Sequence, residues 1–138
     1  MIPYNAITDL IPQRRPMQMI DRLLSVTARG AKGSLSIKED NLFIEKGFLS
    51  ESALIEFIAQ TAAAYTGYNN MINKTPVKEG YIGAVKNLVV FALSPVGSEI
   101  ISEIEIINEI VGFTIISGKV FLEDRLLAEC EMRILAGI

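Results

Sequence analysis

The chain has 138 residues and a formal net charge of −3, and 50% of its residues are hydrophobic. We therefore expect one compact domain over residues 1–138, and the hydrophobic content excludes intrinsic disorder. The negative charge argues against nucleic acid or an anionic membrane as a partner. With one Cys and no His, an internal disulfide and His-dependent nucleophiles are excluded, and we expect neither a metal nor a redox cofactor.

The N-terminus has no positively charged segment followed by an apolar one, so no secretory signal is predicted and a cytoplasmic location is expected. The longest apolar run, residues 53–65, is interrupted by Glu56 and Gln60. It is shorter than the ~18 uncharged residues that a membrane span needs, so we expect no membrane span.

The first third of the chain predicts a turn and a hairpin. Pro12 and Pro16 restrict residues 10–16 to a short turn, after which residues 17–27 are expected to be extended. Residues 32–38 alternate apolar and polar side chains, which is typical of a half-buried strand. We expect this strand to pair with the first one, with Arg29–Ala31 as the turn.

One long helix is predicted from Ala53 to about Met71. Ser50 or Ser52 can be its N-cap, and Glu51 lies where the helix dipole favours a carboxylate. The first half of this helix is apolar on nearly all sides, so the rest of the chain must wrap around it. A polar surface loop is expected over residues 69–78.

The C-terminal half predicts four long strands, and the last of them alternates apolar and charged side chains cleanly. A long helix with a curled antiparallel sheet, polar on one face, gives an α+β fold. The sheet has open edges, so pairing of two subunits edge to edge is expected. The predicted strands are residues 80–93, 98–108, 111–123 and 126–135, with a hairpin turn at Glu123–Arg125.

Several motifs resemble the beta-hydroxyacyl-acyl-carrier-protein dehydratases. Leu10–Met17 with Ile20–Arg22 resembles their N-terminal signature, and Ile55–Ala62 resembles their Glu-Ala-x-Ala-Gln helix. Pro95–Ser98 is similar to their Pro-Val-x-x-Gly-Asp turn. The sequence is most similar to a divergent branch, the dehydratase-like proteins of aryl polyene gene clusters, which have counterparts of Glu56–Gly67, Ile82-Gly83 and Pro95-Val96-Gly97. The resemblance runs from about Leu10 to the last strand and implies a single hot-dog domain.

The sequence also departs from that family. Gln13 replaces a histidine of the N-terminal signature. Members carry Gly-His-Phe-Pro before the helix, whereas this chain reads Lys46–Leu49, so that Gly47 lies where the catalytic histidine would be. The Met-Pro-Gly that precedes the helix is absent too. Glu45 and Lys46 flank the position and could replace the base, although a loop charge is usually only solvated.

Dehydration of a 3-hydroxyacyl thioester needs a base at C2, an acid for the departing hydroxyl, and donors for the enolate. The resemblance implies a histidine for the first and a helix carboxyl for the second, and only the carboxyl, Glu56, is present. Burial among apolar neighbours would favour its neutral form. Alternatively, Glu56 favours the helix dipole and leans into solvent.

Three further residues are candidates for supporting roles. Gln60 lies one turn after Glu56, so it could orient the carboxyl by a hydrogen bond, or instead cap a backbone group. Gly47 and Phe48 are candidate substrate-binding residues, because a glycine amide could approach the thioester oxygen. A turn without a binding role is the simpler explanation of Gly47.

Other polar or reactive residues have simpler structural explanations. Tyr65 and Tyr68 are expected in the core or at its rim, and Cys130 is expected to be a small inert hydrophobe facing inward. Arg14 and Arg15 could position the N-terminal turn or contact an acidic carrier protein.

Three functions remain open. The first is a 3-hydroxyacyl-thioester dehydratase-like lyase in fatty acid or polyene synthesis, acting on acyl carrier protein or coenzyme A thioesters, with Glu56 acting first as base and then as acid. The second is a catalytically weak acyl-binding subunit that completes the site of a histidine-containing hot-dog partner, since sites in the resembling families lie between two subunits. The third is a hot-dog thioesterase in which Glu56 activates water. A homodimer or a heterodimer is expected in each case.

Overall fold

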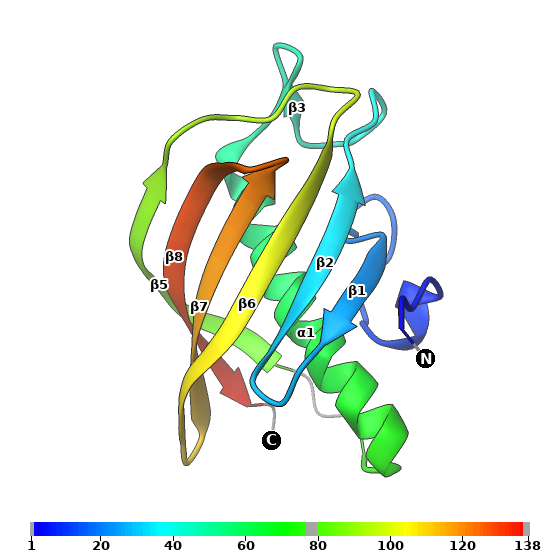
Figure 1. The fold of residues 1–138 in the computed structure, drawn as a ribbon, viewed down its shortest axis with the longest axis vertical. Coiled ribbons are helices and arrows are strands. Elements are labelled where there is room, and N and C mark those ends of the chain that lie inside the picture. Colours follow the sequence, from blue (N-terminus) through cyan, green and yellow to red (C-terminus); the bar gives the residue numbers. More distant parts are fainter. Residues whose placement is uncertain (1, 77–79, 137–138) are drawn as a thin grey trace.

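The computed structural model describes residues 2–76 and 80–136. One long helix, α1, crosses the concave face of a six-stranded antiparallel sheet whose strand order is β1-β2-β6-β7-β8-β5 (Figure 1). A 3-10 helix, η1, precedes the sheet, and a small hairpin of β3 and β4 precedes α1. The elements are η1 Ile7–Asp9, β1 Arg22–Val26, β2 Gly30–Ser36, β3 Ile44–Glu45, β4 Phe48–Leu49, α1 Glu51–Asn73, β5 Gly80–Val90, β6 Glu99–Ile110, β7 Phe113–Leu122 and β8 Arg125–Ala136.

Helix α1 has 23 residues and extends two residues beyond the prediction at each end. Ser50 is the N-cap, but its Oγ lies 3.1 Å from Ser52 Oγ and makes no capping bond to the backbone. At the other end Lys74 adopts a left-handed conformation (φ 54°) and terminates the helix. The loop predicted over 69–78 was therefore wrong in its first five residues, and its last two lie outside the described residues.

The apolar helix packs closely on the sheet, as predicted from its composition. Its core-facing side chains include Phe57 and Ile58, both with no exposed surface. Ile58 packs directly on β7 at Gly118, where any Cβ would collide with its side chain. The glycine therefore decides how near the helix lies to the sheet.

The first strand is shorter than predicted, because β1 begins at Arg22 and not at residue 17. The backbone before it is bound elsewhere. Met17 N–H donates to Arg14 O in a turn, and Met19 N–H donates to the side chain of Gln60 in α1. A side chain from the helix thus takes the hydrogen bond that a neighbouring strand would have made.

The first hairpin turn was also placed too late in the sequence. Thr27 N–H bonds to Gly30 O, so the turn precedes Gly30, which already belongs to β2. A Cβ at Gly30 would collide with Ile104 O of β6. Gly30 therefore allows β2 and β6 to lie close together and does not form the turn.

The four C-terminal strands are present, with ends that shift by up to three residues from the predicted ones. In β6, Ile100, Ile104 and Ile106 are buried while Glu99 and Glu105 are exposed, which confirms the predicted polar face. The β3–β4 hairpin was not predicted, because two-residue strands carry no periodic signal.

The two edges of the sheet differ. At β1, the backbone of Tyr4 exchanges two hydrogen bonds with Leu23 (2.8 and 3.0 Å) and covers the edge. At the β5 edge, Val89 is 43% and Phe91 55% exposed.

Among the described residues, no helix has the length and apolar character needed to cross a membrane.

Candidate active site

A cavity of about 1110 Å³ lies along one side of α1. Its walls come from the N-terminal segment 8–14, from α1 and from the concave side of the sheet. The helix contributes a row of small side chains after Glu56, so that the helix surface is hollow there. The helix residues in the wall are Glu56, Ala59, Ala62, Ala63, Tyr65, Thr66, Gly67 and Asn70. From Glu56 to Asn70 this wall is about 21 Å long, at ~1.5 Å per helical residue.

Glu56 is half-buried in this wall, and Gln60 holds its carboxyl. Gln60 has no exposed surface, and its Nε2 donates to Glu56 Oε1 at 3.1 Å. The hydrogen bond between residues one turn apart that the sequence suggested is therefore present. Glu56 therefore lines the cavity with its carboxyl held by a buried amide.

Gln60 also connects the carboxyl to the N-terminal segment. Its Oε1 accepts from Met19 N–H at 2.6 Å, and its Nε2 donates to Met17 O at 3.0 Å as well as to Glu56. Both alternatives considered for Gln60, orienting the carboxyl and pairing with the backbone, are thus realised at once. Glu56 is coupled through a buried amide to the backbone that leads into β1.

The N-terminal segment is fixed over the helix by two features. Arg14 donates to the carbonyls of Thr8, Ile11 and Gln13 at 3.0, 2.7 and 3.0 Å, so it positions the turn as one reading of the sequence proposed. Gly67 of α1 lies directly below Leu10, where a Cβ would collide with the Leu10 carbonyl. These contacts give the cavity a wall with a defined backbone.

Gly47 and Phe48 lie outside this cavity. They belong to the β3–β4 region, where Gly47 has a φ of 83° and its carbonyl accepts from Val96 N–H at 3.0 Å. Phe48 forms an isolated bridge with Pro95 and is 43% exposed. Neither residue lines the cavity to which Glu56 belongs, so their role in substrate binding stays a prediction.

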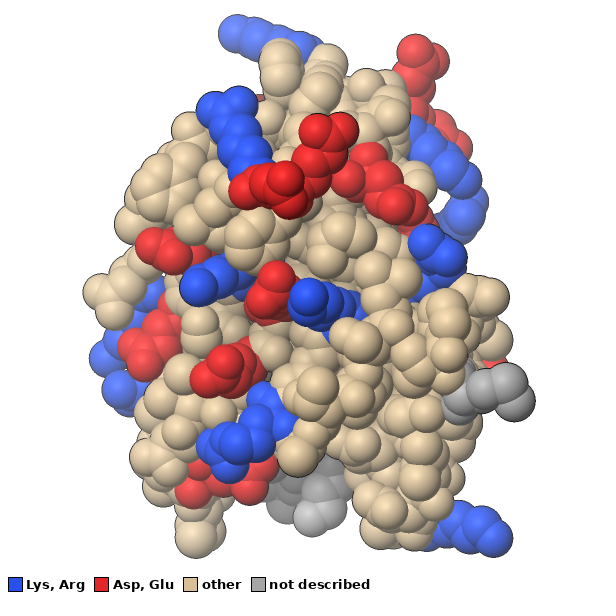
Figure 2. All heavy atoms as spheres, viewed as in Figure 1, with Lys and Arg blue, Asp and Glu red and all other residues tan. Residues whose placement is uncertain are grey.

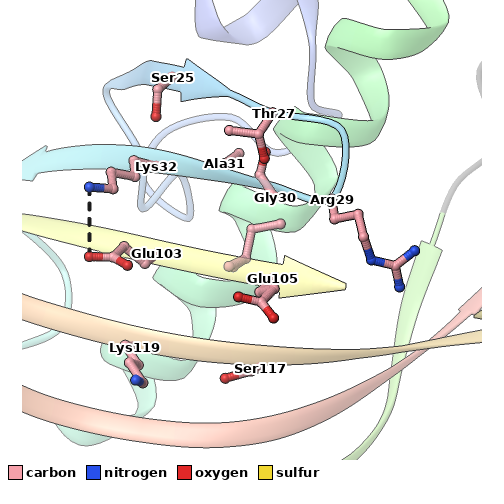
Figure 3. Close-up of a pocket in the computed structure, with 11 residues that line it drawn as sticks. Ser25, Thr27, Arg29, Gly30, Ala31, Lys32, Glu103, Glu105, Ser117 and Lys119 are labelled. Carbon is pink, nitrogen blue, oxygen red and sulfur yellow. Dashed lines mark hydrogen bonds and ion pairs between the residues drawn. The ribbon is translucent and has the colours of Figure 1, made fainter. Parts of the chain in front are cut away.

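A second hollow, of about 310 Å³, lies on the solvent face of the sheet over β1, β2, β6 and β7. Figure 3 shows Lys32 facing Glu103, which are 3.8 Å apart, with Lys119 on the other side of Glu103. Figure 2 shows acidic and basic side chains side by side over the centre and left of this face. Since exposed charges of both signs lie side by side and its volume is less than a third of that of the Glu56 cavity, this hollow is a less suitable site for an acyl chain.

The remaining candidates are structural. Tyr65 and Tyr68 are each 8% exposed, and Tyr65 OH donates to Ala28 O at 2.8 Å. Cys130 is buried, and burial raises the pKa of its thiol to about 11, so that it is protonated and unreactive near neutral pH. Within residues 2–76 and 80–136, no group of three or more carboxylates or thiols is arranged to hold a metal ion.

Most of the cavity wall could not be predicted from the sequence, and Gln13 is an example. In the sequence this residue stands out only as the replacement of a family histidine. In the structure it lines the same cavity as Glu56, and its side-chain oxygen is buried. The available signal was a lone amide in an apolar, proline-bounded segment, which does not reveal where the segment packs.

Comparison with solved structures identifies the architecture. One match is the dehydratase heterocomplex ApeI:P from Xenorhabdus doucetiae, with a TM-score of 0.90 and 14% identity, covering 100% of this chain and 93% of that one. Another is a hypothetical thioesterase with coenzyme A from Streptococcus pneumoniae TIGR4, with a TM-score of 0.67 and 6% identity, covering 83% of each chain. The α+β hot-dog fold predicted from the sequence is confirmed.

An uncharacterised protein, PH1136 from Pyrococcus horikoshii, also shares the fold, with a TM-score of 0.70, 14% identity and coverage of 98% of this chain and 94% of that one. No curated protein sequence matches. A family model does match: the ApeP-like family, described as ApeP dehydratase, aligns with residues 5–136. The chain therefore belongs to the ApeP-like dehydratase family, as its helix and turn motifs suggested.

Proposed function

We propose that this protein is a 3-hydroxyacyl-thioester dehydratase subunit in which Glu56 is the proton-transferring group. The observation that carries the proposal is a half-buried carboxyl, held by a buried amide, in the wall of a long and largely apolar cavity. An apolar cavity with few fixed polar groups is the usual form of a site for an acyl chain. The acyl chain would be carried by acyl carrier protein or coenzyme A, in fatty acid or polyene synthesis.

In the proposed reaction the C2 proton is removed, the C2=C3 double bond forms, and the C3 hydroxyl leaves as water. Glu56 gives a proton to the departing hydroxyl, and Gln60 fixes the direction of the carboxyl. The proton at C2 then needs a separate base. The chain contains no histidine to supply it.

The observations favour a second hot-dog subunit as the source of that base. The relative with a TM-score of 0.90 is described as a dehydratase heterocomplex. The β5 edge of this chain offers a place for a partner, because every described residue of β5 is exposed or half-buried. We infer that the protein pairs there with a histidine-bearing second subunit; a homodimer, the alternative assembly, would contain no histidine to act as the base.

The experiment compares dehydration of a 3-hydroxyacyl-acyl-carrier-protein by the chain alone, by a histidine-bearing hot-dog subunit alone, and by the mixture, followed by enoyl absorbance. The proposal expects turnover in the mixture that exceeds the sum of the two. Equal turnover by the chain alone would mean that Glu56 acts as both base and acid. No turnover in any arm with a verified substrate would overturn the dehydratase proposal.

A second candidate is an acyl thioesterase, favoured by the similarity to the coenzyme A-bound thioesterase structure and by a carboxylate that could activate water. The two reactions release different products. Free thiol without an enoyl product would establish the thioesterase, and an enoyl product without thiol release would exclude it.

A further inference from the structure

Glu56 lies at one end of the cavity. Among the described residues of α1 it is the first to line the wall, and the helix residues that follow it in the wall extend to Asn70. A thioester has two arms, the acyl tail and the arm that joins it to its carrier. When a thioester reacts beside Glu56, only one of these arms lies along the cavity, and the other leaves at the Glu56 end.

The part of the cavity that follows Glu56 is apolar. Ala59 and Ala63 of α1 line it, and both are half-buried, so each keeps accessible surface. From Glu56 to Thr66 this part is about 15 Å long, at ~1.5 Å per helical residue. An extended chain of single bonds advances about 1.2 Å per bond, so this length matches an apolar tail of about twelve bonds. The sheet contributes isoleucines to the wall, namely Ile82, Ile104, Ile106, Ile116 and Ile134.

The charges in the wall disfavour the carrier arm. Acyl carrier protein and coenzyme A both hold the acyl group through a phosphopantetheine arm, which has amide groups and a negative phosphate. The described residues that line the cavity include three with carboxyl groups, Asp9, Glu56 and Glu109, and one cation, Arg14. The Arg14 guanidinium already donates to three carbonyl oxygens. A phosphate in the cavity would therefore lose its hydration beside a mainly acidic wall, whereas an apolar tail has no hydrogen bonds to lose.

We propose that the acyl tail lies along α1 from Glu56 towards Thr66, in contact with Ala59 and Ala63, and that the carrier arm leaves the cavity at the Glu56 end. The inference rests on the proposed function, because it takes Glu56 as the reacting end. Along the helix axis, Ala59 lies about 4.5 Å and Ala63 about 10.5 Å from Glu56. At about 1.2 Å per bond, a tail needs roughly four carbon atoms beyond C3 to reach Ala59 and roughly nine to reach Ala63. The two alanines therefore contact different parts of the tail.

The test measures protection of a thiol, on the full chain and on its complex with the partner. The single cysteine, Cys130, is buried, and burial raises its pKa to about 11, so that the wild type gives little background reaction. Ala59→Cys and Ala63→Cys each place one small thiol in the wall. Modification of this chain by iodoacetamide is followed by mass spectrometry. The probes are 3-hydroxybutyryl-, 3-hydroxyoctanoyl- and 3-hydroxytetradecanoyl-coenzyme A, whose tails are long enough to pass neither alanine, Ala59 alone and both alanines, respectively.

A probe at about ten times its Kd should slow the modification of a thiol that it covers about tenfold. We expect the octanoyl probe to protect the Ala59→Cys variant alone, the tetradecanoyl probe to protect both variants, and the butyryl probe to protect neither. Asn69→Cys is the matched control, because Asn69 is half-buried on the same helix and does not line the cavity. No probe should slow its modification.

Equal protection of the two alanine variants by the octanoyl probe, or protection of neither by the tetradecanoyl probe, would overturn this inference. Turnover by the mixture of subunits in that case would leave the proposed function standing. Protection that follows tail length, without turnover in any arm, would instead overturn the dehydratase proposal and leave the acyl site in place.

Discussion

The two hollows of the molecule lie on opposite sides of one sheet and differ in what holds their polar groups. On the solvent face, Lys32 and Glu103 pair at 3.8 Å, with side chains that are 53% and 42% exposed. On the concave side, the Glu56 carboxyl is held by Gln60, which has no exposed surface. The charged side chains on the first face are exposed to water, whereas the Glu56 carboxyl in the cavity is oriented by a buried neighbour. A hollow that contains charged side chains therefore indicates a functional site only where burial fixes the orientation of those side chains.

The largest effect is expected from Glu56→Gln, measured with whichever subunit composition makes the wild type active. The amide keeps the shape of the side chain and removes the transferable proton, so turnover should fall about 10²- to 10⁴-fold, the usual contribution of one positioned acid. The rate of enoyl formation is the measurement. Glu51→Gln, in the exposed first turn of α1, is the control and should retain wild-type turnover. Near-normal turnover of the Glu56 variant would contradict the assignment.

Gln60→Leu tests whether the buried amide is the reason that the two hollows differ in how their polar groups are held. The change removes three hydrogen bonds and leaves the buried Met19 N–H without its acceptor, so the free energy of unfolding should fall by about 2–3 kcal/mol. Urea denaturation measures this. Turnover should fall as well, because Glu56 loses the group that orients it. A variant with unchanged stability would mean that water replaces the amide.

Gly67→Ala should disturb the wall that covers the cavity. The new methyl group would collide with the Leu10 carbonyl, so the N-terminal segment must move away from α1. We expect a loss of about 1–3 kcal/mol in the free energy of unfolding, as for other overpacked sites. Thr66→Ala, at the exposed neighbouring position, should change stability by less than about 0.5 kcal/mol. Similar values for the two variants would contradict the close packing.

The smallest effect is expected in the hollow of the solvent face. Lys32→Ala removes an exposed ion pair with Glu103, which should change the free energy of unfolding by no more than about 0.5 kcal/mol and turnover not at all. Thermal unfolding at low and at high salt, together with the dehydration assay, checks this. A loss of turnover greater than about threefold would mean that this hollow belongs to the site.

The sequence by itself determined the elements whose signals are local. The apolar helix, the alternation in β6 and the spacing of Glu56 and Gln60 by one turn all follow from residues that are near one another in the chain. They led to the helix, the polar face of the sheet and the Gln60–Glu56 hydrogen bond, each of which the structure contains. The resemblance to dehydratases identified the family from the same local motifs.

The tertiary structure alone decided where distant segments meet. Residues 17–19 were expected in a strand, but Gln60, some forty positions later, takes the backbone hydrogen bonds of Met17 and Met19. Gly30 was expected in a turn and instead permits close contact with Ile104 of β6. Gln13 joins the cavity because the N-terminal segment crosses α1 at Gly67. Such contacts depend on packing between elements far apart in the chain, and no local pattern of polarity encodes them.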